Sequence, residues 1–130
     1  MPFTRISILK EKSEAYKLAL REGIRAALVE AFFVPGSEIY QQLWELDEKN
    51  FEIPSAKSDR FVIIEITAYQ GRSFEAKKNL YRLIAQNLAK SPGIPGNDIL
   101  IILHEPPKEN WGVHGGRPAS EVDLGFKIEV

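Results

Sequence analysis

Two stretches of alternating side chains are each followed by a helical pattern and a turn. In the first half, segment 3–9 (FTRISIL) alternates between its two sides, which predicts a strand. Ser13 is suited to an N-cap and opens a pattern of apolar residues three and four apart, typical of one helix face, that runs to about Phe32. The turn VPGS at 34–37 ends this helix, and 39–46 is predicted to form the second strand.

The second half repeats this order of elements. Segment 60–69 (RFVIIEITAY) is the most β-prone stretch of the chain. Ser73 caps a second predicted helix that runs to about Lys90, with apolar residues four apart. The sequence SPGIPGN at 91–97 ends the helix, and 99–104 is predicted to be the fourth strand.

Two segments lie outside these elements. The polar segment 47–59 contains one proline and is predicted to be a connecting loop. The tail at 106–130 is rich in glycine and proline as far as 125–130 (GFKIEV), which is predicted to pair as a short C-terminal strand.

The two halves also match residue by residue when the sequence is shifted by sixty places. The matched pairs are Ile6–Ile66, Ser13–Ser73, Lys17–Lys77, Leu20–Leu80, Ile24–Ile84, Leu28–Leu88, Pro35–Pro95, Gly36–Gly96, Ile39–Ile99, Leu43–Leu103 and Glu45–Glu105. Helix periodicity explains several of these matches, but it does not explain the shared cap, Pro-Gly turn and following strand. We therefore predict one domain over 1–130, with two β-α-β repeats at about 2–46 and 60–105 and a tail at 106–130.

The predicted fold class is α/β, with a four-stranded sheet and both helices on one face. Parallel strands within each repeat need a crossover, which is almost always right-handed. Segment 61–66 is apolar at odd as well as even positions, so both faces of the sheet are apolar. The face without helices is then costly to leave in water, which predicts that it is covered in an oligomer.

Composition narrows the class of protein. Hydrophobic residues make up 44% and charged residues 27% of the 130, as in ordinary globular domains. The absence of cysteine excludes disulfides, thiolate metal sites and a cysteine nucleophile. Seventeen basic and eighteen acidic residues give a net charge of −1, which argues against nucleic-acid binding. No apolar run suggests a signal peptide or a membrane span, so we expect a cytoplasmic protein.

Pro2 stands directly before the first alternating segment, and it is one of the features that carry a family resemblance. The others are VPGSEIYQ at 34–41, GRSFEAKK at 71–78 and, more weakly, NWG at 110–112. With the gap-free repeat, their order resembles the tautomerase superfamily, in particular its malonate semialdehyde decarboxylase-like subgroup, over nearly the whole chain. The resemblance implies a homotrimer with one site per subunit beside the amino-terminal proline, and no cofactor.

Pro2 is also a candidate on chemical grounds. If Met1 is removed, Pro2 carries a free secondary amine, and the ordinary pKa of an α-amino group, about 7.7–8.0, is already near neutrality. An apolar environment lowers that pKa, whereas a nearby carboxylate raises it. Such an amine can act as a general acid or base, or can condense with a carbonyl. Without a site around it, Pro2 is only a common residue after an initiator methionine.

Arg72 is the second candidate, because it lies where the third strand ends and the second helix begins. A guanidinium there can bind a carboxylate or an enolate oxygen, next to the backbone donors of the helix start. The alternative is a solvated loop arginine. The matching strip of the resembling subgroup carries two arginines separated by a proline, whereas this chain has Gln70, Gly71 and Arg72. The missing charge puts decarboxylase activity in question.

Five further positions complete the candidate site, each with a structural alternative. Glu38 can orient the Pro2 amine or a water molecule, or it can be an exposed acid after a turn. Tyr40 can donate a hydrogen bond to substrate, or simply pack. Trp111, with Val113 and Phe126, can form an apolar wall, or can pin the tail to the core. His104 and His114 lack a third ligand at metal-site spacing, so no metal site is predicted.

Three functions remain open from the sequence. The first is a cofactor-independent enzyme that moves a proton next to a carbonyl in a small keto or oxo acid, with Pro2 as base and acid, Arg72 holding an oxygen and Gln70 donating a hydrogen bond. The second is decarboxylation or hydration of a 3-oxo or unsaturated acid, with Pro2 kept cationic by Glu38. The third is a non-catalytic trimeric binding module.

Overall fold

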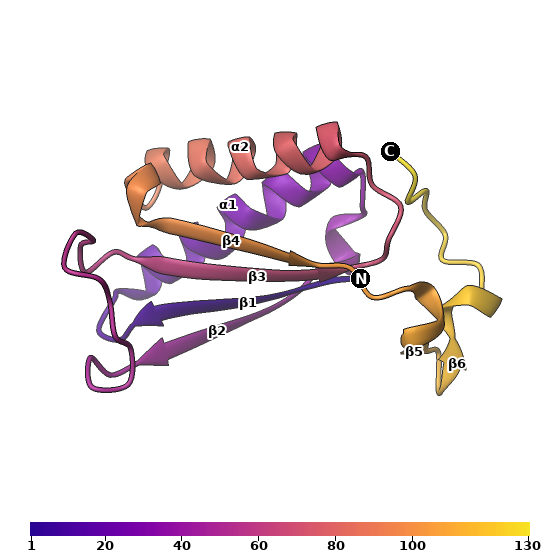
Figure 1. The fold of residues 1–130 in the computed structure, drawn as a ribbon, viewed down its shortest axis with the longest axis horizontal. Coiled ribbons are helices and arrows are strands. Elements are labelled where there is room, and N and C mark those ends of the chain that lie inside the picture. The colour runs from indigo at the N-terminus through magenta and orange to yellow at the C-terminus, as the bar shows by residue number, and fades with distance from the viewer.

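The computed structural model describes residues 1–130, in which four strands form one mixed sheet and two helices cover one of its faces (Figure 1). The strand order is β2-β1-β3-β4. The elements are β1 (Pro2–Leu9), α1 (Glu14–Phe32), β2 (Tyr40–Leu46), β3 (Val62–Ala68), α2 (Phe74–Lys90) and β4 (Ile99–His104). The predicted α/β fold class is therefore confirmed.

The pairing of the strands shows how the two repeats meet. Strand β1 pairs in parallel with β2, and β3 pairs in parallel with β4, so each half is a β-α-β unit. The halves join through the antiparallel pair of β1 and β3, in which Pro2 lies opposite Ala68. The start of β1 therefore lies beside the end of β3, and the end of β1 lies beside the start of β3.

Both helices begin at the predicted caps. The Ser13 hydroxyl accepts from the Tyr16 amide at 3.1 Å, and the Ser73 hydroxyl accepts from the Ala76 amide at 3.1 Å. Each cap satisfies one of the backbone donors that a helix start leaves without an intrahelical partner. The first turn of each helix is therefore held at the same point of its repeat.

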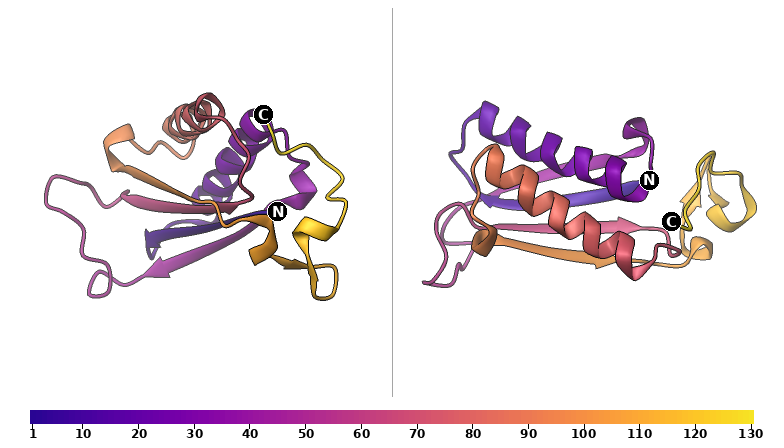
Figure 2. Two further views of the ribbon diagram at one scale, coloured as in Figure 1. Left: turned by 45° about the vertical axis from the view of Figure 1, so that its right-hand side comes forward. Right: turned by 90° about the horizontal axis from the view of Figure 1, so that it is seen from above.

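The core fills the space between the helices and the covered face of the sheet. Buried residues alternate along β1 and β3, with Ile6, Ile64 and Ile66 fully buried. The helices run side by side across the sheet (Figure 2). Gly23 permits their close approach, since a Cβ there would lie 2.9 Å from a methyl carbon of Leu88.

The opposite face of the sheet has no helix over it (Figure 1). Large apolar side chains of the two edge strands lie exposed on it, namely Tyr40, Trp44, Leu100 and Ile102. Arg5 lies near the rings of Phe3 and Trp44 on this face, with its guanidinium carbon 4.9 Å from the ring centroid of Trp44. Large apolar side chains exposed on an uncovered sheet face are typical of a contact surface between chains.

The tail differs from its prediction in one detail. Residues 125–130 form no strand, and the short strands of the tail are β5 (Gly112–Val113) and β6 (Arg117–Pro118), which pair with each other. The end of the chain crosses the turn between β3 and α2, where the Ser73 amide donates to the Val130 carbonyl at 3.0 Å. Because the segment crosses a helix start and not the edge of a strand, it has no row of backbone groups to pair with. Neither helix is long and apolar enough to cross a membrane.

Candidate active site

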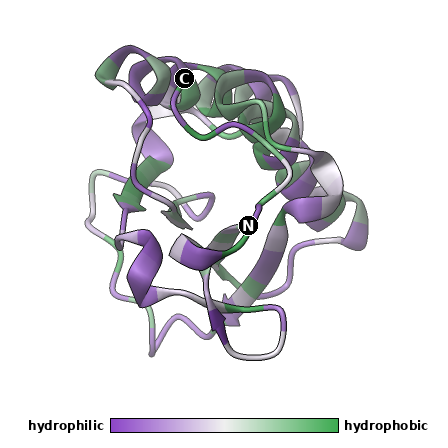
Figure 3. Ribbon diagram, turned by 90° about the vertical axis from the view of Figure 1, so that its right-hand side faces the viewer, coloured by the Kyte–Doolittle hydropathy of each residue, from purple (hydrophilic) through white to green (hydrophobic).

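The candidate residues gather at the end of the sheet where β1 begins. Figure 3 looks onto this end, with the amino terminus at its centre and the tail and the carboxyl terminus beside it. Three chain segments reach it besides β1: the single turn of 3-10 helix at Gly36–Glu38, the turn after β3, and the tail. The topology of the repeat therefore brings together residues from both halves of the chain.

Pro2 is buried, and Met1 lies over it, half-buried. The Met1 ammonium nitrogen lies 3.5 Å from a carboxylate oxygen of Glu38. The Met1 side chain packs against a small apolar cluster that includes Tyr69 and Val113 and is separate from the main core. The terminal amine is thus placed between a carboxylate and an apolar wall.

The surroundings shift the pKa of this amine in opposite directions. Burial is the largest influence and lowers the pKa of the Met1 amine below its ordinary value. The Glu38 carboxylate raises the pKa by its charge and its hydrogen bond, and the positive charge of Arg72 lowers it further. The net shift is downward, which favours the neutral form of the amine.

Arg72 is the most unusual polar residue of this end. Its side chain is only 5% exposed, and its Nη1 donates to the Tyr69 carbonyl at 3.1 Å. The guanidinium carbon lies 4.7 Å from the ring centroid of Phe32, a cation–π contact. Its Nε and Nη2 are buried without a hydrogen-bond partner. Burial lowers the pKa of Arg72, yet a guanidinium stays charged, so two donors of a buried cation are left for an anion.

The backbone beside Arg72 explains its position. Gly71 has φ 134°, and a Cβ there would lie 2.9 Å from Cγ2 of Ile128, so a residue without a side chain is required. Arg72 then directly precedes Ser73, the N-cap of α2. The partial positive charge of the helix start adds to that of the guanidinium.

The apolar wall is built from the turn after β3 and from the tail. The rings of Tyr69 and Trp111 lie 4.6 Å apart between centroids. Trp111 donates from Nε1 to the Pro106 carbonyl at 3.1 Å, which fixes its indole. Val113 is buried in the same cluster, and Phe126 packs against both this cluster and the main core.

The other predicted positions fall into two groups. Glu38 contacts the terminal amine, and Tyr40, two residues later, begins β2 opposite Phe3. Gln70, by contrast, is exposed and makes no side-chain hydrogen bond within the chain. The structure therefore gathers Pro2, Glu38 and Arg72, while the role of Gln70 stays a prediction.

Sequence reasoning did not single out Tyr69 or Phe32. Tyr69 is fully buried next to Arg72, and Phe32, the last residue of α1, supports the guanidinium. One signal was available for Tyr69, because the sixty-residue shift matches it with Leu9. A tyrosine where the other repeat carries leucine suggests a use for the hydroxyl.

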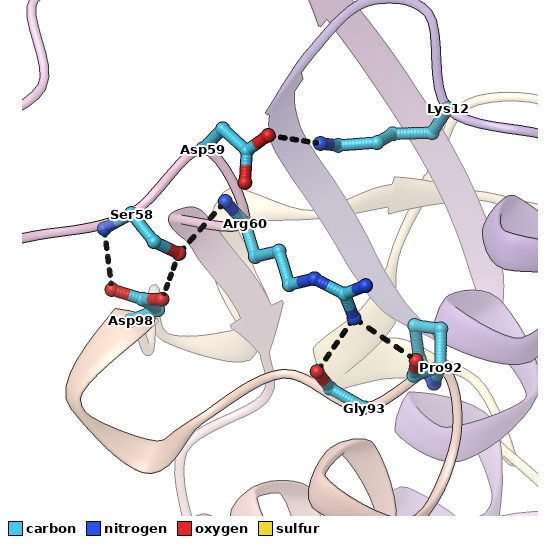
Figure 4. A network of polar contacts seen from close by, with 7 residues as sticks. All are labelled: Lys12, Ser58, Asp59, Arg60, Pro92, Gly93 and Asp98. Carbon is cyan, nitrogen blue, oxygen red and sulfur yellow. Dashed lines mark hydrogen bonds and ion pairs between the residues drawn. The ribbon is translucent and has the colours of Figure 1, made fainter.

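A surface pocket lies at the opposite end of the sheet, and the residues that line it include Lys10, Lys12, Asp47 and Asp59. Lys10 lies 3.3 Å from the Asp47 carboxylate, and Lys12 lies 3.9 Å from that of Asp59. Figure 4 shows the neighbouring network, in which Asp98 accepts from the amide and the hydroxyl of Ser58. Lys10 and Lys12, the basic residues of this end that flank the first helix start, are therefore each paired with an acid.

Comparisons with known proteins show to which family the chain belongs. The family model described as tautomerase enzyme matches residues 38–114. The probable tautomerase YusQ of Bacillus subtilis (strain 168) is 28% identical over 122 residues, covering 90% of this chain and 96% of that protein. The 2-hydroxymuconate tautomerase of Comamonas testosteroni is 35% identical over 51 residues, which are 39% of this chain and 81% of that protein.

Solved structures match over nearly the whole chain. The FG41 malonate semialdehyde decarboxylase inhibited by 3-bromopropiolate has a TM-score of 0.80 and 26% identity, covering 89% of this chain and 92% of that chain. The Q0 fused 4-OT, a symmetric trimer, has a TM-score of 0.80 and 24% identity, covering 91% of this chain and 96% of that chain. The likeness to the fused 4-OT shows a shared fold and nothing more.

Proposed function

The chain belongs to the tautomerase enzyme family, and we propose from this that it is a cofactor-independent isomerase that moves a proton next to the carbonyl of a small keto or oxo acid. The observation that carries the proposal is the buried Arg72 guanidinium, with two nitrogens left without partners, at the same end as the amino terminus. A carboxylate substrate supplies the missing acceptors. Membership of the tautomerase family is the reason for proposing proton transfer as the reaction.

The proposal requires that Met1 is removed, because only then is Pro2 an amine and not an amide. The side chain of Met1 packs against the cluster that contains Tyr69 and Val113. Its removal leaves space for a substrate beside that cluster and exposes the nitrogen of Pro2. The Pro2 amine then lies among the same groups that lower the pKa of the Met1 amine.

In this mechanism the neutral Pro2 amine takes the proton from the enol hydroxyl of the substrate. The O–H electron pair forms the carbonyl double bond, and the electrons of the carbon–carbon double bond take the proton back from the Pro2 ammonium at the neighbouring carbon. Negative charge develops on the oxygen between the two transfers. Arg72 stabilises that charge or holds the carboxylate, since both are anionic oxygens.

Two measurements test the proposal. Intact mass spectrometry must show loss of Met1, since a retained methionine excludes the mechanism. The enol–keto conversion of an aryl pyruvate is then the assay. We expect Pro2→Ala to lower kcat/KM by about a hundredfold or more, because a rotating primary amine replaces a fixed secondary one. Full activity in a folded Pro2→Ala variant, or no turnover in a broad panel of keto and unsaturated acids, contradicts the proposal, and the second result favours a binding module.

The likeness to malonate semialdehyde decarboxylase favours decarboxylation or hydration as the second candidate. In that mechanism Pro2 stays cationic beside Glu38 and polarises the substrate carbonyl. The activity then depends on an amine with a pKa above the ordinary value, whereas the isomerase needs one below it. Burial lowers the pKa of the Met1 amine at this position, and the same burial around a freed Pro2 amine would favour the isomerase. A pH–rate profile on each substrate class distinguishes the two.

We further propose that the chain is a homotrimer that buries the sheet face without helices. The exposed Trp44 and Ile102 on that face support this assembly, as does the trimeric state of the fused 4-OT of similar fold. We expect sedimentation to give three times the 14.7 kDa of one chain. A monomer that persists at micromolar concentration contradicts the assembly.

A further inference from the structure

We propose that Tyr69 is a catalytic residue whose hydroxyl donates a hydrogen bond, next to Arg72, to the substrate oxygen that becomes negatively charged. The inference rests on the proposed function, because it assigns a second donor to the same site. No proton leaves the tyrosine in this role. Its O–H shortens its contact with the oxygen while the charge is present and relaxes when the carbonyl forms again.

The first argument is the state of the hydroxyl. The Tyr69 side chain has no exposed surface, and its oxygen has no hydrogen-bond partner within the chain. A buried hydroxyl without a partner is destabilising, and native proteins satisfy most such groups. The two free nitrogens of Arg72, whose Nη1 donates to the carbonyl of Tyr69 itself, show the same deficit. An oxygen-rich ligand that reaches both side chains would satisfy both of them.

The second argument is the direction in which the hydroxyl acts. Burial raises the pKa of Tyr69, so that the phenol keeps its proton. The Glu38 carboxylate raises the pKa of Tyr69 further, as does the Tyr40 phenol when it is ionised, and the charge of Arg72 opposes them. Glu38 and Arg72 also act on the amine of the amino terminus. A protonated phenol at this point can donate to an enolate oxygen, and the Trp111 ring, 4.6 Å away, holds the aromatic ring in place.

The third argument comes from the repeat. Leu9, the residue matched with Tyr69, is half-buried at the end of β1. An aliphatic side chain is therefore compatible with this position of the repeat. The phenolic oxygen adds an unsatisfied polar atom in the half that carries the site, and the fold does not require it.

The chain also supplies a matched control. Tyr16 has a buried hydroxyl without a partner too, but it lies between Lys12 and Arg60 at the other end of the sheet. Tyr16→Phe and Tyr69→Phe each remove one oxygen from a buried phenol. If loss of a buried hydroxyl lowers activity in a general way, both variants lose activity. If Tyr69 is catalytic, only Tyr69→Phe does.

We expect Tyr69→Phe to lower kcat for the aryl pyruvate by about ten- to a hundredfold, with KM changed less than about threefold, since the bond is strongest to the charged oxygen. Tyr16→Phe should keep the wild-type kcat. Should Tyr69→Phe fail to fold, Tyr69→Leu takes its place, because leucine is what the other half carries. A folded Tyr69 variant with unchanged kcat, or an equal loss in Tyr16→Phe, overturns the proposal.

A second readout separates this inference from the proposed function. If the wild type converts no keto acid, the function fails, and titration with oxalate then tests the donor alone, because oxalate is a flat anion that mimics an enolate. We expect Tyr69→Phe to weaken oxalate binding about fivefold or more and Tyr16→Phe to leave it unchanged. Equal affinities in wild type and Tyr69→Phe exclude Tyr69 as a donor to the ligand.

Discussion

At one end of the sheet Arg72 directly precedes the N-cap of α2, and at the other end Lys12 directly precedes the N-cap of α1. The residue before each cation has a positive φ, 134° at Gly71 and 79° at Glu11. The two turns thus share a backbone course that most residues avoid. The two cations differ in their contacts. Lys12 is paired with Asp59, whereas Arg72 is buried and two of its donors have no partner.

Asp98 and Glu38, which occupy matched positions in the two repeats, also differ in how many partners they have within the chain. Asp98 is buried and accepts from the amide of Ser58 at 3.0 Å and from its hydroxyl. Glu38, its counterpart, is half-exposed and contacts only the terminal amine. Figure 4 shows that Arg60 is equally occupied, donating to the carbonyls of Pro92 and Gly93. At one end, Asp98 and Arg60 are therefore satisfied from within the chain, although the Tyr16 hydroxyl is not. At the other end, two buried donors of Arg72 and the hydroxyl of Tyr69 have no partner in the chain.

To test this difference between the two ends of the sheet, we expect the largest effect from substitution of Arg72, compared with Lys12 at the matched position. Arg72→Ala should lower kcat/KM on every carboxylate substrate by more than about a hundredfold, because it removes a charged, desolvated donor pair. Lys12→Ala, at the matched position, should leave kcat/KM within about twofold of the wild type. Steady-state kinetics of the two variants, with circular dichroism as the check of folding, decides the matter. Equal losses at both positions indicate a shared structural role for the two cations.

Gln70 offers a gain-of-function test at the same turn. The resembling subgroup carries a second arginine there, whereas Gln70 is exposed and makes no side-chain hydrogen bond. We expect weak or absent malonate semialdehyde decarboxylase activity in the wild type. Gln70→Arg should raise it by about tenfold or more, since a charge-assisted hydrogen bond contributes about 1.5–3 kcal/mol. Release of carbon dioxide is the measurement.

The controls for this variant follow from the repeat. Lys10 is the residue that matches Gln70, so Lys10→Arg is the paired substitution and should change nothing. An efficient decarboxylase in the wild type contradicts the expectation. So does a folded Gln70→Arg variant that binds the acid and gains no activity.

Most of the fold follows from local patterns. Ser13 and Ser73 mark the helix starts, because a cap depends on residues only three apart. The β-α-β units follow from periodicity and from the repeat. The tail strands do not, because two-residue strands such as Gly112–Val113 have no periodicity to detect.

The candidate site was only partly predictable for a similar reason. Pro2, Glu38 and Arg72 could be named from their places at strand and helix ends. The burial of Arg72, however, depends on Phe32, forty positions earlier in the sequence, and the turn beside it depends on Ile128. The packing of Tyr69 against Trp111 likewise depends on where the tail folds back. Such long-range contacts leave no local signal in one sequence.

The smallest expected effect concerns stability and compares the two acids. Asp98→Ala should lower the Tm by about 5 °C at neutral pH, because Ser58 loses both of its bonds to the carboxylate, whereas Glu38→Ala should change it by less than about 2 °C. The Ser58 bonds lower the pKa of Asp98. Their stabilisation is therefore fully present above the ordinary carboxyl pKa of about 3.9 and is lost as the pH falls through the lowered value. Thermal melts of wild type and Asp98→Ala should accordingly converge in strong acid. If Glu38→Ala is destabilised as much as Asp98→Ala, Glu38 is a structural acid like its counterpart, and the two ends of the sheet do not differ as we infer.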